Sequence, residues 1–358
     1  MEYSVEELNS SNAQDWNKLN EENAQGSFYH TLKWIEAVDR FSVSSQAKPS
    51  HFIVYRNDEA VALCPFYRNK WKIKGLFTMC CLMSYEHIIV SCPDDALVAK
   101  QIVLKCKEIL RKESGLGFTK ITLLPETKDF FRSMNLVPHQ SPGWSAGVMK
   151  LDLREYSPQM VWSGLLSRKD RRKINFAERD GWKIEEAKSE EELRSFYAYY
   201  RTNLEYLHAR DIPEFNFFAY LMKTFFPNEM LVFLLRKDET IAGGALALLF
   251  ERKKTMYYRY AALNRQVPAR YSPLLSLMWH MVKKASEMGY TTLSFGGTPP
   301  KPDIHYLDKA KFGCRFEPRY EVTFPRLGVL VNSTVKRLDS IAHTISATQK
   351  LPKSANEE

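Results

Sequence analysis

Two glycines and a lysine near the C-terminal end of the chain are well suited to hold a reacting group. Gly296 and Gly297 follow residues 290–295 (YTTLSF), whose alternation is typical of a strand. Glycines at a strand end allow a ligand to approach the backbone, and open α/β sheets bind ligands at the carboxyl ends of their strands. Lys309 follows in a short segment predicted to be helical. By sequence alone, a surface lysine is the simpler interpretation of Lys309, and a plain strand end is the alternative role of Gly296 and Gly297.

A basic cluster at residues 168–173 (RKDRRK) is a second candidate site. On a helix, Arg168, Arg171 and Arg172 fall on one stripe, opposite an apolar face. Arginines suit bidentate contact with phosphate better than lysines do. Most charge runs are solvated surfaces, so the cluster indicates either phosphate or tRNA binding or a solvated helix face.

Tyrosines are the remaining candidates. Tyr258 lies in the strand and Tyr271 in the loop that precede the glycines, and a tyrosine hydroxyl there could contact substrate or protonate a leaving group. Packing is the simpler role for both. The histidines and the six cysteines show no ligand-pair spacing, so we expect neither a metal site nor a disulfide framework.

A strand, a helix and a second strand must position these residues. Residues 255–261 (TMYYRYA) have the composition of a strand. Ser272 and Pro273 supply a helix start, and Gly289 follows the end of the apolar helical periodicity. Such a unit places its two strands parallel, which puts the glycines at the carboxyl end of the sheet.

The order of elements occurs twice. Each half contains a strand, two helices, three antiparallel strands, a helix, a strand and a short helix, which indicates a tandem duplication of one α/β unit. The predicted fold class is α/β (α+β), with mixed, mostly antiparallel sheets. We expect units at 1–150 and 182–326, a connecting helix at 151–181, a C-terminal helix at 327–349 and a disordered tail at 350–358.

Composition sets broad limits. The chain has 358 residues, 44% of them hydrophobic, enough for two packed domains. A net charge of +9 favours acidic partners such as phosphates, nucleic acid or an anionic membrane surface. The N-terminus lacks an apolar signal and no apolar run approaches the roughly 18 residues of a membrane span. We therefore expect a soluble, cytoplasmic protein.

Three sequence regions resemble motifs of the Fem-type peptidyltransferases, which belong to the GCN5-related N-acetyltransferase (GNAT) superfamily. Residues 28–34 (FYHTLKW) are similar to an early Gln-Ser/Thr-x-x-Trp segment, with His30 in place of glutamine. Residues 171–181 (RRKINFAERDG) resemble the Arg-x-x-Ile-x-x-Ala-x-x-x-Gly connecting helix. Residues 293–297 and 309–313 resemble the Phe-Asp-x-Gly and Phe-Lys-x-x-Phe-Gly closing motifs. Ser294 replaces the usual aspartate and Asp308 the usual aromatic residue.

The resemblance, which spans about residues 5–325, implies two tandem GNAT-like domains and an acyltransferase activity. Fem-type enzymes transfer an amino acid from charged tRNA to an amine of a phosphorylated acceptor, and their relatives use other acyl groups. The implied co-substrate is thus a charged tRNA or an acyl thioester, with no bound cofactor. Lys309 would be the catalytic cation that stabilises the oxyanion. The implied substrate contacts are Arg168, Arg171, Arg172, Tyr258, Tyr271, Gly296 and Gly297.

Residues 264–272 (NRQVPARYS) depart from the superfamily. The acetyl-CoA loop, Gln/Arg-x-x-Gly-x-Gly/Ala, should follow the fourth strand of a copy, and this segment does not match it. We therefore expect little ordinary CoA binding by the second half. A tRNA- or anion-binding module without turnover is the alternative function. A doubly wound nucleotide enzyme is disfavoured, because the sequence has neither G-x-G-x-x-G nor a P-loop.

Overall fold

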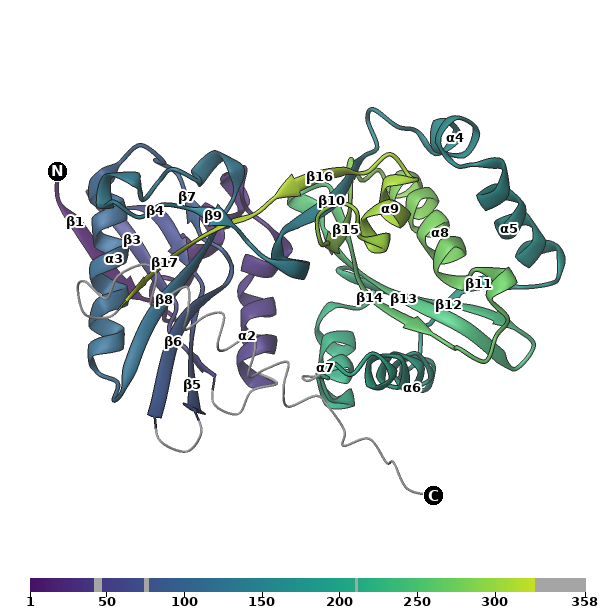
Figure 1. Ribbon diagram of the computed structural model, residues 1–358, viewed down its shortest axis with the longest axis horizontal. Helices are drawn as coiled ribbons and strands as arrows, with labels where there is room; N and C mark the ends of the chain where they lie inside the picture. The colour runs from purple at the N-terminus through teal and green to yellow at the C-terminus, as the bar shows by residue number, and fades with distance from the viewer. Residues whose placement is uncertain (42–46, 74–76, 210–211, 326–358) are drawn as a thin grey trace, which may run out of the picture.

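The computed structural model describes residues 1–41, 47–73, 77–209 and 212–325, which form two α/β domains (Figure 1). Within these ranges the strands form a four-stranded sheet (β1-β3-β4-β7), a six-stranded sheet (β2-β5-β6-β8-β17-β9) and a seven-stranded sheet (β11-β12-β13-β14-β15-β10-β16). Most neighbouring strands are antiparallel, and β6–β8 and β14–β15 are parallel pairs. The predicted fold class is confirmed.

The first domain contains the two smaller sheets. Its helices are α1 (Ala13–Glu22), α2 (Leu32–Arg40) and α3 (Ala96–Arg111). Its strands from this half of the chain are β1 (Tyr3–Glu7), β2 (Lys48–Pro49), β3 (Phe52–Arg56), β4 (Glu59–Cys64), β5 (Phe66–Ile73), β6 (Phe77–His87), β7 (Ile89–Val90), β8 (Leu116–Leu123) and β9 (His139–Gln140).

Helix α3 packs against strands of both sheets of this domain. The Asp95 carboxylate accepts hydrogen bonds from the backbone N–H groups of Leu97 and Val98, which caps the first turn. Apolar residues at helical spacing then bury one face against the sheets; these are Val98, Ile102, Val103, Cys106, Ile109 and Leu110.

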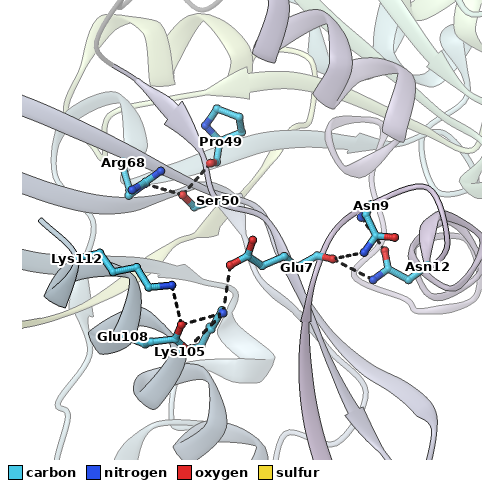
Figure 2. Close-up of polar contacts among 9 residues, drawn as sticks. All are labelled: Glu7, Asn9, Asn12, Pro49, Ser50, Arg68, Lys105, Glu108 and Lys112. Atoms are coloured by element: carbon cyan, nitrogen blue, oxygen red, sulfur yellow. Dashed lines mark hydrogen bonds and ion pairs between the residues drawn. The ribbon is translucent and has the colours of Figure 1, made fainter.

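Polar contacts fasten the N-terminal strand to this helix (Figure 2). Lys105 Nζ donates to Glu7 Oε1 at 3.3 Å and also contacts Glu108 on its own helix. The backbone oxygen of Glu7 accepts from the side-chain amides of Asn9 and Asn12. These contacts hold β1 at the edge of its sheet and turn the chain into α1.

The second domain is built on the seven-stranded sheet. Its helices are α4 (Pro158–Met160), α5 (Arg168–Arg179), α6 (Glu190–Tyr206), α7 (Phe215–Phe225), α8 (Pro273–Glu287) and α9 (Ile304–Ala310). The remaining strands are β10 (Gly147–Asp152), β11 (Lys183–Glu186), β12 (Met230–Lys237), β13 (Thr240–Phe250), β14 (Thr255–Leu263), β15 (Thr292–Gly297), β16 (Arg315–Pro318) and β17 (Tyr320–Pro325). Helices α5 and α8 pack on one face of this sheet, and α6 and α7 pack on the other (Figure 1).

The two domains exchange strands, which corrects the predicted boundaries. Strand β10 begins inside the range predicted for the first unit and ends inside the range predicted for the connecting helix, yet it pairs with β15 and β16 in the second domain. Strand β17 lies inside the range predicted for the second unit, yet it pairs with β8 and β9 in the first domain (Figure 1). Long-range pairing decides the position of such short strands, so division of the sequence at 1–150 and 182–326 could not place them.

The connection between the halves is also different from the single helix expected at 151–181. After β10 the chain forms the one-turn helix α4, a π-helical turn at Val161–Leu165 and then α5, which ends before Gly181. Gly181 has a φ of +90°, a conformation that favours glycine after a helix. The helix predicted at 327–349 and the tail predicted at 350–358 lie outside the described residues.

Candidate active site

The parallel strands β14 and β15 separate at their carboxyl ends. They pair at Thr255, Met256 and Tyr257 of β14, and the last residue of β15 in this ladder is Ser294. Beyond that point β14 remains paired with β13, whereas β15 remains paired with β10. The separation opens a wedge in the sheet, and a cavity of about 1620 Å³ lies there, lined by residues of both domains.

The equivalent strands of the first domain stay together. Strands β6 and β8 pair from Met79 opposite Leu116 to His87 opposite Thr122. An irregularity interrupts this ladder, and there the Ser84 hydroxyl accepts a hydrogen bond from Thr122 N at 2.8 Å. The side chain thus fills the place of a missing backbone bond. Of these two parallel strand pairs, β14 and β15 therefore form the open wedge, where the glycines and Lys309 lie.

Lys309 lies at this wedge. It is on α9, whose first turn is capped by the Asp303 carboxylate, which accepts from His305 N at 2.8 Å. Lys309 Nζ donates to Gly297 O at 2.9 Å and to Thr298 Oγ1 at 2.7 Å. Burial lowers the pKa of Lys309 to about 8. The structure thus brings the predicted lysine and glycines together on one cavity wall.

Glycine is needed at positions 296 and 297 for two different structural reasons. Gly296 has a backbone φ of +72°, a conformation that residues with a side chain rarely adopt. A Cβ at Gly297 would lie 2.7 Å from the backbone oxygen of Trp144, so the close approach there is made by another part of the chain. Both line the cavity beside the Trp144 ring, whose centroid is 5.9 Å from Lys309 Nζ.

The two predicted tyrosines occupy different environments. Tyr258 lines the cavity, with its ring 5.8 Å from that of Phe295, and burial raises the pKa of its hydroxyl. The Tyr271 ring stacks on that of Phe176 of α5, with their centroids 5.4 Å apart, and its hydroxyl accepts a hydrogen bond from Arg270. Only Tyr258 of this pair is on the cavity wall, and Tyr271 packs between α5 and the start of α8.

The arginine stripe of α5 is divided in the structure. Arg168 and Arg172 are exposed, as predicted for a basic helix face, but neither lines the cavity. Arg171 is half-buried, and its Nη1 donates to three carbonyl oxygens of the preceding turn, those of Trp162, Ser163 and Leu166. Arg171 is therefore not part of a solvated helix face, because its guanidinium donates to the carbonyl oxygens in and just after the π-helical turn.

Charged residues from both domains complete the wall, and sequence patterns did not single them out. Glu86 of β6 and Arg319, which follows β16, form an ion pair on the cavity wall. Arg259 of β14 extends into the same cavity. A single arginine in a tyrosine-rich strand matches no sequence motif. Its position, two residues after the last β14–β15 pair, becomes apparent only when the pairing register of the strands is known.

Within residues 1–41, 47–73, 77–209 and 212–325, no group of three or more His, Cys, Asp or Glu side chains is arranged to hold a metal ion. No helix in these ranges is long and apolar enough to cross a membrane.

These features define a two-domain α/β protein with a cavity of about 1620 Å³ at the point where β14 and β15 separate. Residues 166–306 match the family model of the acetyltransferase (GNAT) domain. This range begins just before α5 and includes the wedge, the loop at 264–272 and the start of α9. No curated protein sequence matches the chain significantly.

Solved structures share the whole architecture. FemX has a TM-score of 0.66 at 14% identity, covering 94% of this chain and 99% of that one. A tandem GNAT protein from the clavulanic acid biosynthesis pathway has a TM-score of 0.60 at 12% identity, covering 92% and 100%. The C-terminal domain of a putative lysylphosphatidylglycerol synthetase from Agrobacterium fabrum has a TM-score of 0.56 at 15% identity, covering 90% and 93%. The chain therefore has the tandem GNAT fold that these structures share, and its second half contains an acetyltransferase (GNAT) domain.

Proposed function

We propose that this protein transfers an acyl or aminoacyl group to an amine in the cavity at the β14–β15 wedge. The match to an acetyltransferase domain supports acyl transfer in general. The position of Lys309 carries the specific proposal, because its ammonium group lies beside the strand end, with two hydrogen-bond acceptors fixing it at 2.7 and 2.9 Å.

The chemistry needs a polarised carbonyl and a positioned amine. The amine nitrogen attacks the acyl carbon, a C–N bond forms, and the C–O or C–S bond to the donor breaks. The amine loses a proton and the leaving oxygen or sulfur gains one. Negative charge develops on the carbonyl oxygen during the attack, and a fixed ammonium group in a partly buried site stabilises it. Direct transfer requires no covalent intermediate with the protein.

The loop at 264–272 argues for a donor other than ordinary acetyl-CoA. Several of its backbone N–H groups have acceptors within the loop: Gln266 N donates to Asn264 Oδ1, Tyr271 N to Pro268 O and Ser272 N to Ala269 O. Amides that are already bonded are not available to cradle a pyrophosphate. We therefore propose that the donor is a charged tRNA or an acyl thioester other than acetyl-CoA. As in the Fem-type proteins that the sequence resembles, the proposed acceptor is a phosphorylated amine. The proposed location is the cytoplasm.

A mass-spectrometric screen tests this function. Aminoacyl-tRNAs, acyl-CoAs and acyl-carrier thioesters are each offered with a panel of amines, and the acylated amine is measured. Product that requires the parent protein and is strongly reduced with Lys309→Ala would support the proposal. Binding of tRNA without product for any donor would instead favour an anion-binding module, to which exposed Arg168 and Arg172 would contribute.

A further inference from the structure

Arg259 is forced out of the regular ladder of β14. Leu246 of β13 lies opposite Tyr260, and the next residue, Ala247, lies opposite Tyr258. Arg259 is thus the extra residue of a β-bulge between them. A bulge redirects a side chain from the direction that regular alternation would give it. Here the bulge lies just after the last β14–β15 pair, where the wedge opens.

The Arg259 side chain is exposed and surrounded by aromatic rings. Its guanidinium carbon is 4.9 Å from the ring centroid of Tyr260, 5.1 Å from that of Tyr29 and 5.8 Å from that of Trp34. Tyr29 and Trp34 belong to the first domain, so the guanidinium lies between the domains. Stacking on rings fixes the plane of the group and leaves its N–H edges for another partner.

The charge of Arg259 has no carboxylate partner among the described residues. The side chains that act on it are the phenols of Tyr260, Tyr29 and Tyr85. By contrast, two other cations on the same cavity wall are paired, Arg319 with Glu86 and Lys150 with Glu317. A guanidinium has five N–H donors, and a carboxylate or phosphate can accept two of them at once.

Arg259 and Lys309 occupy opposite arms of the wedge. Arg259 is on the β14 arm, and Lys309 is bonded to Gly297 at the end of the β15 arm. A molecule that fills the space between them can contact both. We propose that Arg259 binds an anionic group, a carboxylate or a phosphate, of the amine acceptor. This inference rests on the proposed transferase function for the identity of the ligand as acceptor.

Direct binding tests the anion site without any need for turnover. Phenyl phosphate and phenylacetate combine an anion with a ring that suits the aromatic wall, and isothermal titration calorimetry measures their affinities. We expect Arg259→Gln to weaken binding about tenfold or more, and Arg259→Lys to lose less because the charge remains. Tight binding of phenyl phosphate alone would assign a phosphate, and tight binding of phenylacetate alone a carboxylate.

Arg194→Gln is the matched control. Arg194 is an arginine 3.9 Å above the ring of Phe215, on the same domain but outside the cavity lining. The same change of side chain there should leave both affinities within about twofold. Equal losses in the two variants, or no loss in Arg259→Gln, would overturn the anion site.

The assay also separates this inference from the proposed function. If the probes bind through Arg259 and no donor yields product, the transferase function fails while the anion site stands. If turnover is found and Arg259→Gln changes neither probe binding nor the KM for the acceptor, the transferase function stands and Arg259 is not its anion site.

Discussion

The carboxylate of Glu86 and the guanidinium of Arg319 form a mostly buried ion pair between segments that are more than 200 residues apart in the chain. Burial alone would raise the pKa of Glu86, but Arg319 and a hydrogen bond with His87 lower it well below its usual range. Arg319 N also donates to Ala146 O at 2.9 Å. The pair therefore fastens the strand exchange at the point where the chain returns to the first domain.

Removal of one partner of this pair should destabilise the fold. Glu86→Gln leaves the Arg319 charge mostly buried without its counter-charge, and we expect a loss of about 3 kcal/mol in the free energy of unfolding. Urea denaturation followed by circular dichroism measures it. The double variant Glu86→Gln, Arg319→Gln should lose less than the sum of the single changes. A single variant as stable as the parent would show that the pair contributes little.

Acid should remove the contribution of the Glu86–Arg319 ion pair to the stability of the fold. Because the folded-state pKa of Glu86 is depressed, its stabilisation is present above the unfolded-state pKa of about 4.5 and is lost as the pH falls below it. Parent stability measured from pH 6 to pH 3 should therefore fall more steeply than that of Glu86→Gln. Parallel curves would contradict this interpretation.

Lys309 should determine the rate of acyl transfer and part of the pH dependence of that rate. Its pKa of about 8 means that the ammonium form, which the proposed mechanism needs, is lost as the pH rises through 8. Turnover should fall there on the alkaline side, and Lys309→Ala should be slower by a factor of about 10² to 10³ at pH 7. The test is kcat against pH for both proteins. A parent rate that rises through pH 8 would instead indicate that the neutral amine acts as a base.

Arg171 should contribute to stability more than to binding. Arg171→Ala removes three hydrogen bonds to backbone carbonyl oxygens, so we expect a loss of about 1–3 kcal/mol. Arg172→Ala, one residue further along the same helix and exposed, should change stability by less than about 0.5 kcal/mol. Thermal denaturation of both variants tests this prediction. Equal melting temperatures would show that the hydrogen bonds of Arg171 contribute no more to stability than an exposed arginine does.

Acetyl-CoA should bind weakly to the second domain. The internal hydrogen bonds of residues 264–272 leave few free amides for the pyrophosphate. Calorimetric titration should give a Kd above about 1 mM, which corresponds to roughly −4 kcal/mol. A micromolar, stoichiometric complex that is abolished by changes in this loop would contradict the prediction.

Local patterns predicted the local structure well. Helix α8 runs from Pro273 to Glu287, between the predicted start at Pro273 and Gly289, which has a φ of +73°. Ser272 has a left-handed backbone, and its side chain makes no capping hydrogen bond. The repeated order of elements and the resemblance to Fem-type proteins agree with the two-domain GNAT fold. Each of these features depends on residues close together in the sequence.

Features that depend on distant pairing were not predictable in this way. Strands β10 and β17 are six residues each, and nothing in their sequences identifies the sheet that they join. Arg259 became a candidate only through the register of β13 with β14. Arg171 showed the limit of helix periodicity, which places a side chain on a face but does not reveal a carbonyl cluster in the preceding turn.

The exchange of β10 and β17 has a consequence for synthesis on the ribosome. The first sheet receives β17, with Val322 and Phe324 buried, only after residue 325 has emerged. Until then the edge of β8 has no partner there, and the apolar surface that β17 covers is open to water. Because an unpaired edge invites wrong pairing, the nascent first domain remains incomplete and prone to mispairing while the roughly 200 residues between β8 and the end of β17 are synthesised.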